Sequence, residues 1–586
     1  MRTLLTFLSA PVFAAALSYE INFVGLKDSA VLKSMFDVSD LVVLQDRPPA
    51  SINGLRYRIA SDIPSLMKVL HAYGYYDAAI TSEIDSKKEV VQVFLLIRPG
   101  PQYTLASYEV YHGDCTEIAA LPNCCPFTPE SLDLEIGKPA IAANIINAEL
   151  QLLTELARCG YPLAAVEKRK VEVDMAAKDV AAASCINEGP LSKFGPTTIF
   201  GLEKLDPSFI EKRIRWQEGM IYNPDAVEET QKRLLNTDLF SSVMVTHGDE
   251  LDSLGELPMK MSITEALTRQ FAIGAYYATV DGPGVSLSWV HRNVWGKGDI
   301  FSIDADISKR YIAGSATYKI LDFLVLDQTY KAVGEVYRED IHPYLAFTYW
   351  GGNYLERKID SRRNFSVGFK VEHINISESA TNGTYLLAGL PVFLKYYTPE
   401  NPLDPVSGYS MVYQALPYQS LFHANQRFID QRLTNTIYIP VVPSKFLVLA
   451  IRTQLGSIAG TRQKNVPLNK LFLGGSEDDL RGYRYKTVSP LDARGRPLGG
   501  RSAIFISLEA RFRFYDKIGI VPFADFGTVT FSEIPQVDAK WFKSIGIGAR
   551  YFSFFGPLRL DVAFPLDRRE GIDSFYQIYA SVGQTF

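Results

Sequence analysis

Residues 471–485 read LFLGGSEDDLRGYRY and lie in an unusually long stretch without strand pattern, from about Ser457 to Ala503. Loops beyond roughly 12 to 15 residues are normally either functional or disordered. This one combines aromatic and leucine side chains with three glycines, a mixture suited to close packing inside a cavity rather than to a solvated tail. The stretch therefore predicts a lid or plug set between β segments.

The segments around this loop alternate strictly between apolar and polar residues, which is the period of a β-strand. Charged residues oppose continuous apolar faces, as expected for a lipid-facing wall around a polar lumen, although a soluble sandwich has the same period. At roughly 20 residues per strand and connection, the chain from Leu267 onward predicts a barrel of about 16 antiparallel strands. The clearest alternating segments are residues 301–308, 365–372, 504–514 and 558–564.

The first 16 residues resemble an export signal in their order of features. Arg2 precedes an apolar run, and Ala14-Ala15-Ala16 supplies small residues for cleavage. A buried first strand or helix is the alternative. No later window holds about 18 consecutive apolar residues, so a chain that crosses a membrane must cross it as a barrel. A net charge of -5 and a pI near 5.9 give no basic face that would favour nucleic acid.

Between the signal and the barrel, the periodicity changes from strand to helix and back three times. Each unit predicts the order β-α-α-β-β, and in two of them the long helix is followed by Gly-Tyr, at Gly74 and Gly160. Glycine there ends the helix and turns the chain into a strand. The predicted organisation is a signal peptide at 1–16, repeat units at 17–101, 102–190 and 191–265, and the barrel at 266–586.

Four motifs carry a family resemblance. Leu480-Arg481-Gly482-Tyr483 matches the loop motif (V/L)-R-G-(Y/F), and residues 292–298, 401–409 and 524–527 resemble other barrel elements of the same family. The chain resembles the bacterial surface antigen family, in which POTRA domains precede a barrel and which includes the assembly factors BamA and TamA. With three POTRA units, it is more similar to the TamA type than to BamA, which usually carries five.

The resemblance implies a factor of the bacterial outer membrane, with POTRA domains in the periplasm, that folds and inserts client barrels or autotransporters. Its implied partners are unfolded outer-membrane proteins, outer-membrane lipid and a TamB-like protein that spans the periplasm. No motif of hydrolase, metalloprotease or nucleotide chemistry occurs, so neither an enzyme nor a cofactor is expected. The alternatives are a two-partner secretion transporter that exports an unfolded polypeptide and a passive porin.

Within the loop motif, Arg481 offers a fork of donors that a carboxylate can accept in two bonds. The resemblance makes Asp525 its expected partner, with room made by Gly527 and with Glu509 as a further acceptor. This pair would hold the loop, including Leu480, Gly482 and Tyr483, inside the lumen. The alternative is an ordinary turn with the arginine in water.

The seam, where the first strand must meet the last at residues 575–586, is the second candidate site. Tyr576, Ile578 and terminal Phe586 are expected on one face, as in a targeting signal, and Gly583 is expected to bend the final residues inward. A seam weakened in this way could accept a client strand through backbone hydrogen bonds. A permanently closed barrel, in which Gly583 only relieves crowding, is the alternative.

All five cysteines fall in the second unit, and an oxidising compartment favours disulfides. A bridge from Cys115 to Cys124 or Cys125 could pin the Pro-rich loop, and a bridge from Cys159 to Cys185 could join the long helix to the last strand of this unit, which leaves one thiol over. The sequence does not specify the connectivity. Adjacent cysteines without a second ligand pair are weak evidence for a metal, so no metal site is predicted.

Overall fold

The computed structural model describes residues 17–87, 90–119, 122, 124, 128–278, 282–422, 426–442, 446–514, 517–553, 556–582, 584 and 586. The expected signal peptide, residues 1–16, lies outside them. The chain divides into two compact units, one built mostly from the residues before 262 and one that contains the large sheet up to Phe586. None of the described helices is both long enough and apolar enough to cross a membrane.

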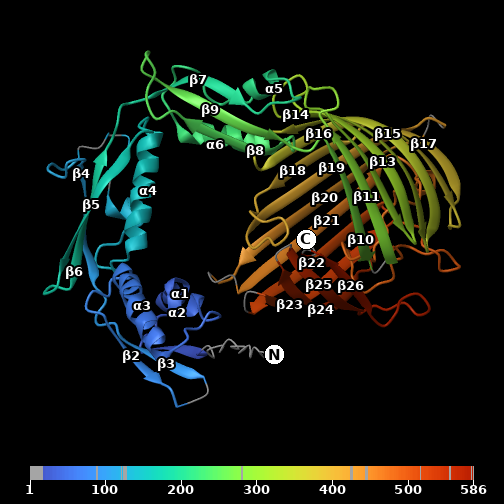
Figure 1. Cartoon of the computed structure of the whole chain (residues 1–586). Helices are drawn as coiled ribbons and strands as arrows, with labels where there is room; N and C mark the ends of the chain where they lie inside the picture. The colour runs from blue at the N-terminus through green and yellow to red at the C-terminus, as the bar shows by residue number, and fades with distance from the viewer. Residues whose placement is uncertain are drawn as a thin grey trace, which may run out of the picture. The chain divides into compact units, whose positions relative to one another are not determined.

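Three small sheets precede the large one (Figure 1). Their strand orders are β1-β3-β2, β4-β6-β5 and β7-β9-β8, so the last strand of each unit lies between the other two. The predicted β-α-α-β-β repeat is confirmed. The first unit comprises β1 (Tyr19–Val24), α1 (Ser29–Val38), α2 (Asp40–Val43), α3 (Ile52–Ala72), β2 (Ala79–Asp85) and β3 (Val91–Arg98).

The second and third units follow the same order, except that a short 3-10 helix takes the place of the first helix in the second unit. The second comprises β4 (Thr104–His112), η1 (Pro129–Leu132), α4 (Ala142–Arg158), β5 (Ala165–Asp174) and β6 (Asp179–Asn187). The third comprises β7 (Lys193–Phe200), α5 (Ser208–Glu211), α6 (Pro224–Leu235), β8 (Phe240–His247) and β9 (Glu256–Glu265).

The disulfides of the second unit join Cys115 to Cys185 and Cys124 to Cys159. The expected pairings were therefore wrong. Strands β4 and β6 are parallel neighbours with Tyr111 opposite Cys185, so the turn that follows β4 brings Cys115 back over β6. Cys159, at the C-terminal end of α4, is left for Cys124. Cys125 lies outside the described residues.

The large sheet contains β10 to β26 in antiparallel order, and it curves round into a barrel (Figure 1). Each strand pairs with the next along the chain, except that β16 and β19 each pair with both β17 and β18. Strands β17 and β18 share the neighbours β16 and β19, so they are two halves of one strand and the barrel has sixteen strand positions. The prediction of about 16 strands is confirmed. Their bounds are β10 (Arg269–Ala278), β11 (Gly282–Arg292), β12 (Ile300–Ser308), β13 (Tyr311–Ile320), β14 (Gln328–Ile341), β15 (Tyr344–Lys358), β16 (Arg363–Ser377), β17 (Gly383–Gly389), β18 (Val392–Tyr397), β19 (Gly408–Ser420), β20 (Arg427–Pro440), β21 (Leu447–Ala459), β22 (Ser502–Phe514), β23 (Ile518–Thr530), β24 (Phe542–Ser553), β25 (Gly556–Pro565) and β26 (Gln577–Val582).

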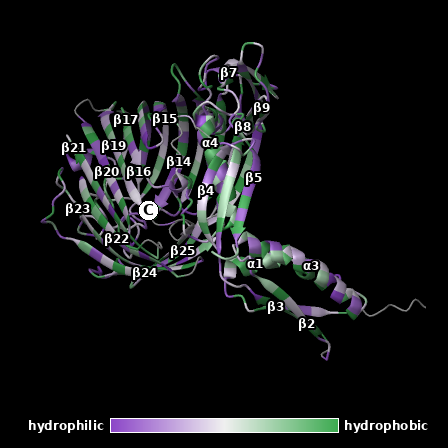
Figure 2. Ribbon diagram, turned by 90° about the vertical axis from the view of Figure 1, so that its left-hand side faces the viewer, coloured by the Kyte–Doolittle hydropathy of each residue, from purple (hydrophilic) through white to green (hydrophobic). Residues whose placement is uncertain are grey.

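The barrel wall is apolar outside and charged inside. On β25, Leu558 and Leu560 are 38% and 50% exposed, whereas Arg559 and Asp561, which alternate with them, are buried. Figure 2 shows this alternation of hydrophobic and hydrophilic residues along the barrel strands. Exposed leucines opposite buried charges invert the pattern of a water-soluble domain, as expected where the outer face meets lipid and the inner face lines a polar lumen.

An ion pair between the buried Glu149 and the partly exposed Arg169 joins helix and sheet in the second unit. The carboxylate of Glu149 on α4 accepts hydrogen bonds from Arg169 Nε at 2.8 Å and from Ser184 Oγ at 2.6 Å. Burial alone would raise the pKa of Glu149, but the bonds from Arg169 and Ser184 outweigh it and lower that pKa below its ordinary value.

We predict that Glu149→Gln lowers the free energy of unfolding of this unit at neutral pH by about 2 kcal/mol. The loss is smaller than for a fully buried pair because Arg169 is partly exposed. A carboxylate with a lowered pKa stabilises the fold above its ordinary value of 4.5, and this stabilisation is lost as the pH falls below that value. Hydrogen exchange of α4 and β6 amides in the full chain, corrected for intrinsic rates, should therefore differ between the proteins at pH 7 and converge in acid. Glu155→Gln, at an exposed position of the same helix, is the control, and an equal effect there would contradict the prediction.

Candidate functional site

The segment between β21 and β22, residues 460–501 and here called the lumen loop, enters the barrel. Apart from the short helix η2 (Gln463–Asn465), it contains only isolated bridges such as Phe472 to Gly500 and Gly474 to Val488. Leu480, Arg481 and Tyr483 are at most 1% exposed and belong, with the neighbouring wall, to the interior of the barrel. The structure thus places the predicted plug segment in the lumen.

Arg481 is fully buried and bonded to the wall. Its Nε donates to Asp525 Oδ2 at 2.7 Å and its Nη2 to Asp525 Oδ1 at 2.8 Å, and its backbone N–H reaches the same carboxylate at 3.2 Å. The guanidinium also lies over the ring of Phe523, 3.5 Å from its centroid. The expected two-bond contact between Arg481 and Asp525 on β23 is present.

Two further carboxylates complete the surroundings of this guanidinium. Nη1 donates to Glu509 Oε1 at 2.9 Å, as expected, and to Asp561 Oδ2 at 3.1 Å. Asp561 was not predicted: alternation places it on the polar face of β25, but nothing in the sequence brings that strand to the loop. Around these groups, four arginines face four carboxylates in ion pairs: Arg481, Arg511, Arg550 and Arg559 with Glu477, Glu509, Asp525 and Asp561.

The next two residues of the motif attach the loop to other strands. Gly482 has a φ of +92°, and its N–H donates to Tyr579 Oη on β26 at 2.9 Å. The positive φ favours glycine, and a Cβ at this position would lie in tight contact with the backbone nitrogen of Pro565, at 3.1 Å. Tyr483 Oη donates to the carbonyl of Lys543 at 2.7 Å. The lumen loop therefore holds the last strand directly.

Gly527 serves a different neighbour from the one expected. A Cβ there would lie 2.6 Å from Cδ1 of Phe505 and 3.4 Å from Cδ2 of Leu480. The space that Gly527 leaves is filled by Phe505, which packs under Leu480 of the motif. The residue makes room for the loop's apolar contact rather than for the contact between Arg481 and Asp525.

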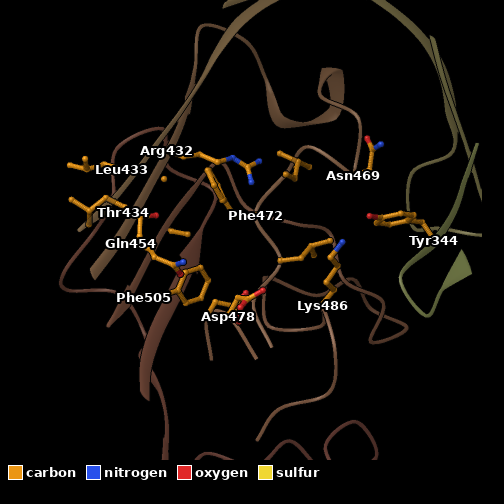
Figure 3. A pocket seen from close by; sticks show the side chains of 16 residues that line it. Tyr344, Arg432, Leu433, Thr434, Gln454, Asn469, Phe472, Asp478, Lys486 and Phe505 are labelled. Carbon is orange, nitrogen blue, oxygen red and sulfur yellow. The ribbon is translucent and has the colours of Figure 1, made fainter. Parts of the chain in front are cut away.

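Two lysines of the loop reach the opposite wall. Lys470 Nζ donates to the buried Glu372 on β16 at 2.9 Å, and Lys486 Nζ donates to Glu339 on β14 at 2.7 Å. Between the loop and strands β20 and β21 lies a cavity of about 250 Å³. Figure 3 shows Arg432, Phe472 and Lys486 among its lining side chains. The loop is thus anchored on both sides of the lumen.

The seam lies between β10 and β26, the two ends of the strand order. Some of their Cα atoms come within 8 Å of each other, yet among the described residues β10 pairs only with β11 and β26 only with β25. Tyr576 and Ile578 are exposed, as predicted for an outward face, and so are Phe271 and Ile273 on β10. Gly583 lies outside the described residues.

Phe586 is not on that outward face, and this prediction was wrong. Arg511 Nη2 donates to the Phe586 carbonyl at 2.7 Å, and the Arg452 guanidinium lies over its ring at 4.3 Å. Gln584 bonds to Arg550 at 2.9 Å and to Asp404 at 3.1 Å. Because the lumen supplies cations for both the backbone oxygen and the ring, the chain end turns inward after β26.

Comparisons with known proteins agree with this geometry. A profile described as the Omp85 superfamily domain matches residues 275–586, and a POTRA profile, described as a surface antigen variable number repeat, matches residues 192–265. Outer membrane protein assembly factor BamA of Nitratidesulfovibrio vulgaris is 23% identical over 554 residues, which cover 88% of this chain. They cover 66% of that relative, so the chain spans just under two thirds of its length.

A solved structure supports the fold. The crystal structure of BamA from Haemophilus ducreyi lacking POTRA domains 1–3 superposes with a TM-score of 0.63 at 16% identity. The match covers 82% of this chain and 100% of that structure.

We predict that Arg481→Ala lowers the free energy of unfolding of the detergent-solubilised chain by about 3 to 5 kcal/mol, because it leaves buried carboxylates without their shared cation. The free energy of unfolding of Arg481→Lys should lie between those of the unchanged protein and Arg481→Ala, since lysine keeps the charge but not the two-bond fork. Denaturant titration measures both. The control is Arg494→Ala, an exposed arginine of the same loop, expected within about 0.5 kcal/mol of the unchanged protein. Equal values for Arg481→Ala and Arg494→Ala would contradict the anchoring role.

Proposed function

The chain belongs to the Omp85 superfamily, and on that premise we propose that it is an outer-membrane protein assembly factor that inserts client barrels by strand addition at its seam. The barrel lies in the bacterial outer membrane and the POTRA domains lie in the periplasm. As a member of this superfamily the chain is not an enzyme.

The observation that carries the proposal is the seam between β10 and β26, where no ladder joins the described residues of the two strands. Every unpaired N–H or C=O that faces lipid costs several kcal/mol, so such an edge is a template for another strand. A client strand that pairs there contributes backbone hydrogen bonds, which do not depend on the client's sequence. Folding and lipid burial of the client then supply the driving force.

The lumen loop supports this function by holding β26 from inside. Gly482 bonds to Tyr579 of that strand, and the buried Arg481 attaches the same stretch of loop to β22, β23 and β25. With these contacts, β26 keeps its place without a ladder to β10. The edge would remain available to a client while the rest of the barrel stays folded.

The alternatives receive less support from the same residues. A porin needs a water-filled lumen and a secretion transporter needs a path for an unfolded chain, whereas here the loop and the side chain of Phe586 occupy the interior. A loop fastened by Arg481, Lys470 and Lys486 would have to lose three sets of ion pairs to open such a path.

The finer proposal is a TamA-like role, with autotransporters among the clients and a TamB-like partner. Three POTRA units favour it, while the curated relative is a BamA. The client classes can be compared by measuring the rates at which the same reconstituted chain inserts an autotransporter and a porin. Efficient insertion of the porin alone would overturn this finer role without touching the general one.

We predict that disulfides which lock the seam abolish client insertion. In a Cys125→Ser background, cysteines would replace Phe271 or Ile273 on β10 and Ile578 or Ala580 on β26, and the pair that crosslinks would be selected. In vesicles, insertion of a client barrel should fall to the rate of empty vesicles when the bond is formed and recover on mild reduction.

The matched control is a disulfide between Val336 and Tyr349, which face each other on the paired strands β14 and β15 and are exposed to a similar degree. It should leave insertion unchanged, because those strands need not part. Full insertion by the chain with a locked seam would refute strand addition at this place.

A further inference from the structure

The outer wall of the barrel carries a hollow on the side remote from the seam. It is a groove of about 520 Å³ over β16 to β21, which stand midway between the two ends of the strand order. Figure 1 shows these strands side by side. The residues that line its outer part are Phe369, Ala388, Leu390, Pro417, Ile429 and Ala459.

The groove results from prolines and small residues at neighbouring positions. Pro391 separates β17 from β18, and Pro417 lies close to it on β19, where the carbonyl of Pro417 accepts from the N–H of Leu390 at 3.1 Å. Neither proline has an N–H to donate, so the ladder is interrupted there. Ala388 and Ala459 leave space that larger side chains fill elsewhere on the wall.

The groove opens toward lipid and not toward the lumen. Phe369 and Leu390 are 47% and 54% exposed, whereas Glu372 on the other face of β16 is buried inside the barrel. Tyr418 and Phe428, which lie behind the groove, are buried in the interior core. Because the outer wall is embedded in the bilayer, its hollow is continuous with the acyl chains around it.

One end of the groove is basic. Arg427 begins β20 and is exposed, and the structure describes no acceptor for its guanidinium within the ranges given above. Arg462 and Lys464 are also exposed and follow Gly460, which adjoins the carbonyl of Arg427. The acidic group nearby is Glu533, which accepts from the Gly460 N–H at 3.4 Å and is paired with Arg501 at 2.6 Å. The end therefore carries an excess of positive charge.

This basic end lies at the external rim. The chain enters β10 from the third POTRA unit, and strands alternate in direction, so β19 ends and β20 begins at the rim away from the periplasm. The lumen loop begins at the same rim, directly after β21. The positive groups thus stand at the level of the headgroups of the outer leaflet.

We propose that the groove binds one acyl chain of a phosphate-bearing lipid of net negative charge in the outer leaflet, with Arg427, Arg462 and Lys464 facing the phosphate. The apolar hollow fits the chain, and the positive rim fits the anionic headgroup. This site depends on the position of the barrel in the outer membrane and not on strand addition at the seam.

The test uses the full chain with Leu390→Trp, which places a fluorophore at the groove, in phosphatidylcholine vesicles doped with a brominated lipid. Brominated phosphatidylglycerol should quench the new tryptophan about fivefold more effectively than brominated phosphatidylcholine at equal mole fraction. Ile545→Trp, at an outward position of similar exposure on β24, is the matched control and should show no preference. Circular dichroism would confirm that each variant is folded.

Two second-site changes separate chain from headgroup. Arg427→Ala in the Leu390→Trp protein should reduce the preference toward that of the control, and Ala459→Phe should reduce quenching by both lipids because it fills the hollow. Equal preference at positions 390 and 545 would overturn the site. Loss of the preference on adding inorganic phosphate alone would indicate an anion site without an acyl chain, and shielding of position 390 from both lipids in a crosslinked dimer would indicate a second copy; either result overturns the proposal.

Discussion

A fully buried guanidinium needs several acceptors, and the interior of this barrel is arranged around that need. Arg481 draws carboxylates from β22, β23 and β25 to one point, and each of these in turn pairs with another arginine or with the loop backbone. Removing one charge from such a set leaves its partners uncompensated, so the set behaves as a unit. The five residues 479–483 therefore fix the loop to the half of the barrel that ends at the seam.

The same arrangement holds β26 in place at the seam, where it does not pair with β10 in the described residues. Tyr579 holds β26 to Gly482, and Phe586 lies in the lumen against Arg511 and Arg452. Strand β26 consequently depends on contacts inside the barrel rather than on β10. An edge that is held from behind can stay open toward lipid without the wall losing its shape.

The sequence predicted the parts of this structure that follow from local pattern. Alternation predicted the strands and their inner and outer faces, and the length of the chain after Leu267 predicted their number. The motif at Arg481 led to Asp525 and Glu509 through family resemblance. The contact between Asp561 and Arg481 was not predicted, because it depends on the closure of the barrel, which no single strand encodes. The position of Phe586 was predicted wrongly because the alternation of β26 was extended to this residue. In the structure Phe586 instead contacts cations in the lumen.

The repeat units show the same limit. Proline usually breaks the interior of a helix, yet α3 starts at Ile52 after a cap by Ser51 and carries Pro64 within it, since tertiary packing outweighs the local cost. The disulfides depended on which strands are neighbours, and five cysteines in one unit do not specify that. The periodicity of the sequence predicts helices and strands, whereas contacts between distant elements can be known only from the fold.

The unequal lengths of the barrel strands have a mechanical consequence. Strands β15 and β16 each have 15 residues, while the described part of β26 has 6. At about 3.3 Å per residue and a strand tilt of roughly 45°, these correspond to about 35 Å and about 14 Å across the membrane, against a hydrocarbon core of about 30 Å. A bilayer that meets a tall wall on one flank and a low one on the other must change thickness across the width of the protein, at a cost of fractions of a kcal/mol per ångström. The bilayer beside the short strands is therefore thinned and stores elastic energy.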